Sequence, residues 1–148
     1  MSIREIMAEE IPKLYACLKA LSEYHNEVSL NHKGSYPTKP YEQTLEKFKN
    51  DIGSGVSRFA VTEDGEKISG FCKIDLEADC GKLDYLIVLA EYRGKGYGGA
   101  LMDWAMSRFR ESGIRKIELK VVAGNEVIHL YEKYGFKINA YILRYTEE

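Results

Sequence analysis

The run RGKGYGG at residues 93–99 combines residue types that bind anions in proteins. Its glycines let the backbone bend sharply and approach a ligand with no Cβ in the way. Arg93 and Lys95 add positive charge at the same point. If a helix begins here, its first backbone N–H groups have no partner within the helix, and its dipole is positive at this end. The run therefore predicts a site for a phosphate-bearing ligand.

Two strands and a helix would hold this turn in place. The segment LDYLIVL at 83–89 is apolar almost throughout, which indicates a central strand covered on both faces. An amphipathic pattern predicts a helix from about 97 to 111, ended by Gly113. The segment IRKIELKVV then alternates apolar and charged residues, as a half-buried strand does. Strand, helix and strand in this order predict a parallel pair with a right-handed crossover.

Hydrophobic periodicity predicts further elements on either side of this unit. The turn residues Asp64-Gly65 predict a β-hairpin, and a polar stretch at 26–39 predicts a long loop. The expected fold is α+β, a mixed and mostly antiparallel sheet of six to seven strands with about four helices on its faces. Helices are expected near 11–21, 41–53 and 127–134, and strands at 2–6, in a hairpin over 58–76, and in one or two segments at 136–145.

Composition narrows the class of protein. The 148 residues predict one domain, 1–148, and a net charge of −2 argues against a general binder of nucleic acid or membrane surfaces. The three cysteines have neither metal-ligand spacing nor an even number, so we expect no zinc site and no disulfide framework. No apolar run approaches the ~18 residues of a membrane span, and the N-terminus does not resemble a signal peptide. We expect a cytoplasmic protein without a metal.

Two common phosphate-binding motifs fit the run poorly. Gly94 to Gly99 matches G-x-G-x-x-G, and Glu118 stands about where a ribose-binding acid would stand. A dinucleotide fold, however, places its first glycine directly after the strand and its acid at the end of the second strand. Here four residues intervene, and Glu118 lies in the middle of a strand. A P-loop would need G-x-x-x-x-G-K-[ST], which the chain lacks.

The pattern Arg93-x-x-Gly96-x-Gly98, after a buried strand ending at Val88, resembles the pyrophosphate motif of the GCN5-related N-acetyltransferases, the GNAT family. IREIMAEEIPKL is similar to that family's first strand and helix, VTEDGEKISGF to its second and third strands, and LYEKYGF to its C-terminal signature. The resemblance covers nearly the whole chain. It implies an acetyltransferase that takes its acyl group from acetyl-CoA.

The resemblance also implies which residues bind the donor. The family splays the strand ending at Val88 away from the next strand, and backbone groups around Ile87 and Val88 bind pantetheine and polarise the thioester carbonyl. Asn125 resembles an asparagine that contacts the pantetheine or thioester region; alternatively it is only a helix N-cap. The residues expected to bind the donor are Ile87, Val88, Arg93, Gly94, Lys95, Gly96, Tyr97, Gly98 and Asn125.

Two further residues are candidates for proton transfer. By family resemblance Tyr131 is the acid that protonates the departing thiolate, and a phenol with a pKa near ~10 is protonated at neutral pH. Tyr131 also lies on the apolar stripe of its helix, where a tyrosine is usually part of the core. Asp84 resembles an acid that takes the amine's proton, often through water. Alternatively it binds the acceptor or only makes a hydrogen bond within its strand.

The sequence leaves the acceptor open. Glu23, Glu27, His32 and Tyr36 lie in or beside the long loop where the family builds its acceptor pocket, and the carboxylates would suit a cationic amine. We predict an N-acetyltransferase acting on a primary amine of a small molecule or peptide by direct attack in a ternary complex. The alternative is a non-catalytic acyl-CoA-binding domain with the same fold. A homodimer is compatible with the resemblance.

Overall fold

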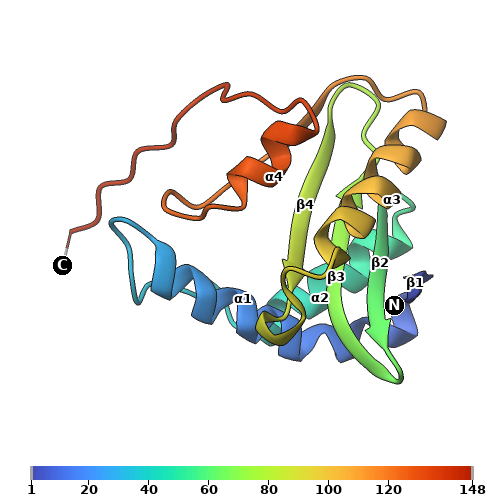
Figure 1. Cartoon of the computed structure of the whole chain (residues 1–148), viewed down its shortest axis with the longest axis horizontal. Coiled ribbons are helices and arrows are strands. Elements are labelled where there is room, and N and C mark those ends of the chain that lie inside the picture. The colour runs from blue at the N-terminus through green and yellow to red at the C-terminus, as the bar shows by residue number, and fades with distance from the viewer. Residues whose placement is uncertain (1, 148) are drawn as a thin grey trace.

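The computed structural model describes residues 2–147 as a five-stranded sheet with helices on both faces (Figure 1). The strand order is β1-β2-β3-β4-β5, and only β4 and β5 run parallel. The strands are β1 (Ser2–Ile6), β2 (Ser57–Asp64), β3 (Lys67–Asp75), β4 (Gly81–Val88) and β5 (Ile117–Leu119). The parallel pair, the hairpin and the mostly antiparallel sheet are confirmed.

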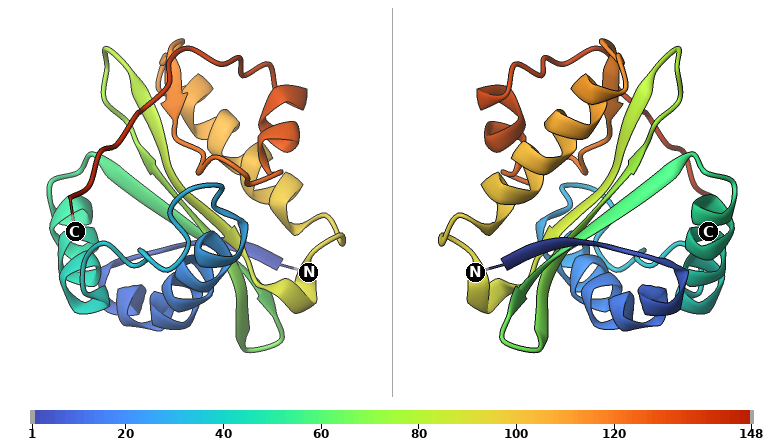
Figure 2. Two further views of the ribbon diagram at one scale, coloured as in Figure 1. Left: turned by 90° about the vertical axis from the view of Figure 1, so that its left-hand side faces the viewer. Right: turned by 90° about the vertical axis from the view of Figure 1, so that its right-hand side faces the viewer.

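The helices lie in two groups, one on each face of the sheet (Figure 2). They are η1 (Ala8–Leu14), α1 (Tyr15–Val28), α2 (Tyr41–Gly53), η2 (Ala90–Tyr92), α3 (Tyr97–Glu111) and α4 (Ile128–Lys133), where η denotes a 3-10 helix. The predicted helices at 41–53 and 97–111 have the expected bounds. The first predicted helix is divided, with Pro12 inside a 3-10 segment, because proline has no N–H for an α-helical bond.

Each face of the sheet has its own apolar core. On the α1 and α2 face, Phe48 from α2 packs against Phe59 and Phe71, with ring centroids 5.0 and 6.1 Å apart. On the α3 and α4 face, Leu101 and Met102 are fully buried in a second cluster. Coverage of both faces explains why β4 is so apolar. No helix within residues 2–147 is long and apolar enough to cross a membrane.

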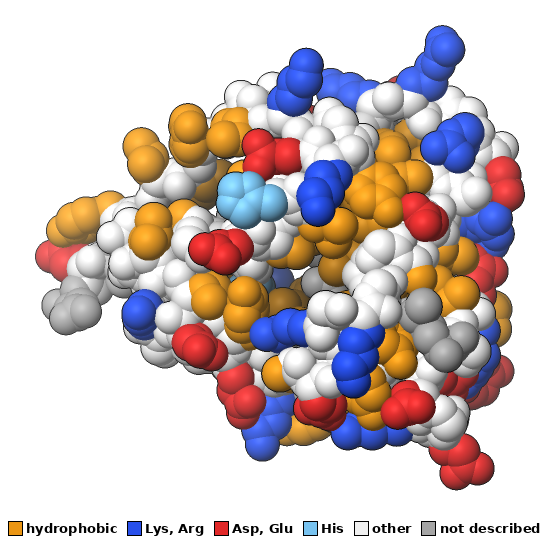
Figure 3. All heavy atoms as spheres, viewed as in Figure 1, with side chains coloured by type: hydrophobic (Ala, Val, Ile, Leu, Met, Phe, Trp, Pro, Cys, Tyr) orange, Lys and Arg blue, Asp and Glu red, His pale blue; other side chains and the backbone are white. Residues whose placement is uncertain are grey.

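The C-terminal segment differs from the sequence-based expectation. Residues 137–147 form no strand, so five strands are seen where six to seven were predicted. A strand needs a neighbour with a free edge, and β5 ends at Leu119 after three residues, which leaves little edge to pair with. Leu143 is 94% exposed, and hydrophobic side chains stand along this projecting segment in Figure 3.

The loop between α1 and α2 is shorter than predicted because α1 continues to Val28. Asn26, within that last turn, organises the loop: its Oδ1 accepts hydrogen bonds from the N–H groups of Gly34 and Tyr36, both at 2.9 Å. The end of α1 also packs on the turn after β5, where the Leu30 N–H donates to the Ala123 carbonyl at 3.0 Å. The loop is thereby held beside the splayed end of the sheet.

Candidate active site

A cavity of about 880 Å³ opens where β4 and β5 separate. The two strands pair at only three positions, from Gly81↔Ile117 to Leu83↔Leu119. Beyond them β4 continues to Val88, while residues 120–123 form the opposite wall of the cavity. The predicted splay is therefore present, and it exposes one edge of β4 within the sheet.

The backbone of β4 alternates between β3 and this gap. The Leu89 N–H donates to the Ser69 carbonyl at 2.8 Å, and a Cβ added at Gly70 would meet the Ile87 carbonyl oxygen at 2.5 Å. Ile87 and Leu89 thus turn their backbone groups to β3, and Leu86 and Val88 turn theirs to the gap. Ile87 and Val88 were both expected to bind the donor with backbone groups. Both residues line the cavity, but only Val88 turns its backbone groups to the gap, whereas those of Ile87 face β3. Leu86 was missed, because sequence does not reveal strand register.

The turn before α3 has the geometry of an anion site. Gly94 and Gly96 adopt φ values of +77° and +88°, which side-chain-bearing residues rarely adopt, and Gly96 is the N-cap of α3. The first amides of α3, those of Tyr97, Gly98 and Gly99, lack helical acceptors by position. The N–H of Arg93, by contrast, donates to the Ala90 carbonyl at 3.2 Å.

Arg93 contributes through its side chain. Its Nε donates to the Val88 carbonyl at 3.0 Å, and its guanidinium carbon lies 4.3 Å from the centre of the Tyr24 ring. The guanidinium therefore links the end of β4 to α1 at the edge of the cavity, with Gly94 and Gly98 also in the cavity wall. A cation beside free helix amides suits a pyrophosphate.

Replacing Arg93 by alanine is expected to weaken coenzyme A binding about 10-fold, because a charge-assisted hydrogen bond to the phosphates is worth roughly 1.5–3 kcal/mol. The dissociation constant is measured by calorimetry at fixed ionic strength. Arg110→Ala is the matched control, since it removes the same charge near the other end of α3, outside the cavity wall. Equal weakening in both variants would contradict a local role for Arg93.

Tyr131 lies on α4 with its side chain in the cavity wall. It is 6% exposed, and its ring packs edge-on against Phe136 at 6.2 Å. Burial, together with the nearby Cys72 thiol, raises the pKa of the Tyr131 hydroxyl above its ordinary value. Tyr131 is therefore both a core residue and a protonated hydroxyl beside the cavity. The two interpretations from the sequence are compatible.

Tyr134, in the same motif, has a different environment. Its hydroxyl donates to Asp103 at 2.6 Å and lies 3.2 Å from the Gly99 carbonyl. Burial and the hydrogen bond to Asp103 raise its pKa to about 12. It joins α4 to α3 and is not part of the cavity wall. This tyrosine therefore supports the structure.

Asn125 both lines the cavity and begins the turn into α4. Its Oδ1 accepts a hydrogen bond from the Val127 N–H at 3.0 Å, and the residue is 9% exposed. This bond closes a turn just before α4, and the N-cap of α4 is Val127, so the N-cap alternative for Asn125 is wrong. Asn125 also lies in the cavity wall, a position that is compatible with a contact to the acyl donor.

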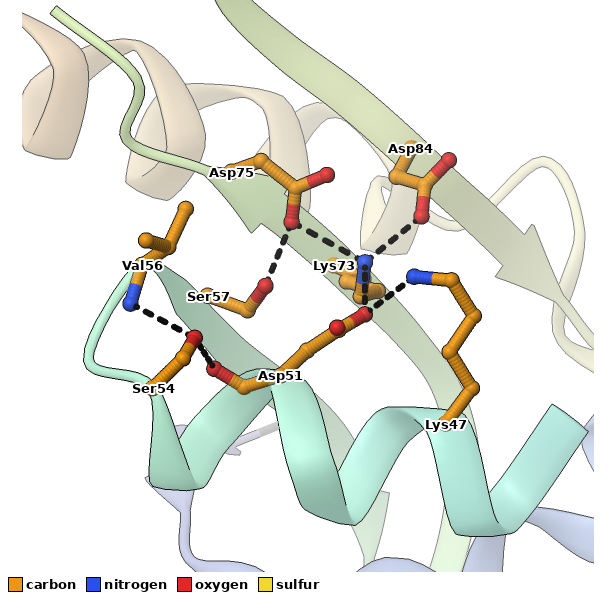
Figure 4. A network of polar contacts seen from close by, with 8 residues as sticks. All are labelled: Lys47, Asp51, Ser54, Val56, Ser57, Lys73, Asp75 and Asp84. Carbon is orange, nitrogen blue, oxygen red and sulfur yellow. Dashed lines mark hydrogen bonds and ion pairs between the residues drawn. The ribbon is translucent and has the colours of Figure 1, made fainter.

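Asp84 also lies in the cavity wall, with its side chain 37% exposed. Its Oδ2 accepts a hydrogen bond from Lys73 Nζ at 2.6 Å (Figure 4). The register of β3 and β4 shifts here, since Lys73 pairs with Tyr85 and Ile74 with Leu83. Asp84 is the extra residue of a β-bulge, a device that redirects a side chain. Sequence reasoning missed both Lys73 and the bulge.

The loop after α1 forms part of the cavity wall. His32 and Tyr36 line it as expected, together with Tyr24 and His25, whereas Glu23 and Glu27 do not. Burial lowers the pKa of His25, so its imidazole favours the neutral form. Among residues 2–147, Asp84 is thus the one residue with a carboxylate that lines this cavity.

Comparison with known proteins agrees with this geometry. The family model described as "Acetyltransferase (GNAT) family" matches residues 18–136. The mycothiol acetyltransferase of Propionibacterium freudenreichii is 41% identical over 59 residues, which are 39% of this chain and 19% of that protein. A ribosomal-protein alanine N-acetyltransferase of Haemophilus influenzae is 30% identical over 88 residues, 60% of each chain. The matches span about a fifth to three fifths of these relatives.

Solved structures show the same fold. The PaiA N-acetyltransferase of Thermoplasma acidophilum, solved with coenzyme A, superposes with a TM-score of 0.79 at 23% identity over 93% of this chain and 90% of that chain. A GCN5-related N-acetyltransferase of Ralstonia eutropha gives 0.80 at 15% identity over 98% and 97%. The splayed strands, the glycine turn and the family match together place this chain in the GNAT family of acetyltransferases, which uses acetyl-CoA as acyl donor.

Proposed function

We propose that this protein transfers the acetyl group of acetyl-CoA to a primary amine by direct attack in a ternary complex. The observation that carries the proposal is that one cavity brings together the amide-rich start of α3, the Tyr131 side chain and the Asp84 carboxylate. An anion site, an acid and a proton acceptor are the groups that this transfer needs. They come from three different elements, α3, α4 and β4.

The residues of β4 and α3 would hold the donor. Its pyrophosphate lies on the first amides of α3 and the Arg93 side chain, and its pantetheine arm follows the open edge of β4. The N–H groups of Leu86 and Val88 face that space, so one of them can donate to the thioester oxygen as negative charge develops there. A main-chain donor held by β3 pairing needs no rearrangement during the reaction.

Two side chains would move protons. Asp84, through a bridging water, takes one proton from the arriving ammonium ion and releases it to bulk solvent. The neutral nitrogen then bonds to the acetyl carbon, loses its second proton to Asp84 through the same water, and the carbon–sulfur bond breaks. Tyr131 donates its proton to the departing sulfur, so that the products are an acetamide and the free thiol of coenzyme A. Bulk solvent restores both side chains to their starting states.

Direct attack is preferred to a cysteine intermediate because of the state of the thiols. Cys72 is fully buried, and burial raises the pKa of Cys17 to about 11. Protonated, enclosed thiols are poor nucleophiles. The free cysteines also favour a reducing compartment, and we propose the cytoplasm.

The acceptor proposed is a primary amine of a small molecule or of a peptide. The names of the two relatives mention mycothiol and an alanine of a ribosomal protein, so both classes of acceptor are open to this fold. The Asp84 carboxylate beside Tyr24, His25 and Tyr36 suits an amine that arrives as an ammonium ion.

The first experiment measures thiol release from acetyl-CoA against a panel of small amines and N-terminal peptides. We expect one class of amine to give turnover. Asp84→Asn, which keeps the size of the side chain, should lower kcat/KM for that amine about 100-fold at pH 7, because general-base catalysis typically contributes 10²–10⁴-fold. Tight binding of acetyl-CoA without amine-dependent release across the panel would instead support the non-catalytic acyl-CoA-binding domain.

A further inference from the structure

Lys73 is an unusual residue for the middle of a sheet. Its side chain is fully buried on the face of β3 that packs against α2, and its ammonium lies 5.7 and 6.0 Å from the centres of the Phe48 and Phe59 rings. A buried ammonium is unfavourable unless carboxylates compensate it. Three do so: Asp51 of α2 at 3.0 Å, Asp75 of β3 at 2.9 Å and Asp84 of β4 at 2.6 Å (Figure 4).

The ammonium stays charged in this environment. Burial alone would lower the pKa of Lys73, but the hydrogen bonds and charges of Asp84 and Asp75 outweigh it and hold the pKa above its ordinary value. The group is therefore a fixed positive charge at every pH at which the protein would be assayed.

The three carboxylates depend on Lys73 to different degrees. Asp51 also accepts a hydrogen bond from Lys47 at 2.6 Å, and Asp75 also accepts one from Ser57 at 2.5 Å. Asp84, within the described contacts, is held by Lys73. Removal of the ammonium would leave Asp51 and Asp75 with a donor each, but would free the Asp84 side chain to rotate.

We propose that Lys73 is a positioning residue, which fixes the Asp84 carboxylate so that its second oxygen is presented to the incoming amine. The bulge turns Asp84 toward Lys73, one oxygen is bound there, and the other points away from the ammonium (Figure 4). Asp84 lies in the cavity wall, so the second oxygen is the one available to the substrate. This inference rests on the proposed acetyl transfer to an ammonium-bearing acceptor.

Lys73→Met, which keeps the length of the apolar stem, is the direct test. We expect kcat/KM for the acceptor to fall about tenfold at pH 7.5, because the carboxylate is no longer oriented, with the KM for acetyl-CoA unchanged. The loss should depend on Asp84: in an Asp84→Asn background, where no carboxylate remains to be oriented, Lys73→Met should lower kcat/KM by no more than about twofold further.

This comparison separates Asp84 from the other charged groups around Lys73, which are Asp51 and Lys47 from α2 and Asp75 from β3. A tenfold loss that persists when Lys73→Met is added to Asp84→Asn would arise from one of those groups or from the fold, and it would overturn the proposal.

The matched control is Lys47→Met. Lys47 also binds Asp51, but its side chain is 62% exposed and does not contact Asp84. We expect its kcat/KM to change less than twofold, as is usual for an exposed ion pair.

If Lys73→Met does not fold, a second pair of variants provides the test. Lys73→Met/Asp75→Asn removes one positive and one negative charge together, which avoids an uncompensated buried carboxylate. Compared with Asp75→Asn alone, it should show the same tenfold loss of kcat/KM for the acceptor, with the KM for acetyl-CoA unchanged. A variant whose KM for acetyl-CoA rises in the same proportion would mean that Lys73 only stabilises the fold, and the proposal would fail.

Failure of the proposed function would look different. If no amine supports thiol release in the wild type, the acetyl-transfer assignment fails before any variant is compared. If wild-type turnover is present and Asp84→Asn lowers it, but Lys73→Met leaves kcat/KM unchanged, only the role of Lys73 is refuted.

Discussion

Tyr131→Phe is expected to lower kcat for acetyl transfer about 100-fold or more, because it removes the group that we propose as proton donor to the departing sulfur. The KM for acetyl-CoA should change little, since the ring still fills its buried place against Phe136. Steady-state thiol release at saturating acetyl-CoA measures this effect. The loss should be smaller with an acyl donor whose leaving group is less basic, because such a group needs less help from an acid.

Tyr134→Phe is the control for the proposed role of Tyr131. It removes a hydroxyl from the same motif, but that hydroxyl binds Asp103 and lies outside the cavity wall. We expect a stability loss of about 1 kcal/mol, as for a typical hydrogen bond, with kcat within a factor of about three of the wild type. Comparable kcat in the wild type and Tyr131→Phe would show that Tyr131 is only a packing residue.

Gly124→Ala is expected to lower the free energy of unfolding by about 3 kcal/mol or more, through backbone strain and a steric clash. Gly124 has φ +104°, and an added Cβ would overlap the Val28 carbonyl oxygen. That oxygen belongs to the end of α1, which is held to the same turn by the bond from Leu30 to Ala123. Relief of the clash would therefore displace the loop at the acceptor end. Urea unfolding followed by circular dichroism measures the loss.

Gly113→Ala separates the two causes. Gly113 also has a positive φ of +72°, but an added Cβ there would meet nothing within 4 Å. Its replacement should cost only the conformational strain, about 1–2 kcal/mol. If both variants lose the same stability, the close approach of α1 to the turn after β5 makes no contribution.

Local signals in the sequence were sufficient for much of this fold. The helix at 97–111 was correctly bounded because its apolar stripe, the preceding glycines and Gly113 all agree. The hairpin at Asp64-Gly65 was likewise marked by its turn residues. The prediction of a strand in the C-terminal segment was wrong. The composition of this segment favours a strand, but a strand must pair with the edge of another strand, and β5 is too short to provide that edge.

The candidate site was only partly accessible from sequence. Tyr131, Asp84 and the turn at Arg93 were named from motifs, and all line the cavity. Lys73 could not be found in this way, since its role depends on two carboxylates that are distant in sequence. Asp51 lies 22 residues before it and Asp84 lies 11 residues after it. The shift in strand register that turns Asp84 toward it leaves no pattern in residue types.

The separation of β4 from β5 also has a consequence for solvent exchange of backbone amides. Leu86 and Val88 present their N–H groups to the gap, while the neighbouring Ile87 and Leu89 face β3. In the free protein, deuterium should enter at 86 and 88 quickly and at 87 and 89 slowly, an odd–even contrast within one buried strand. A donor bound along this edge would slow amide exchange at 86 and 88 and remove the contrast. The exchange rates of these two amides therefore report whether the donor site is occupied.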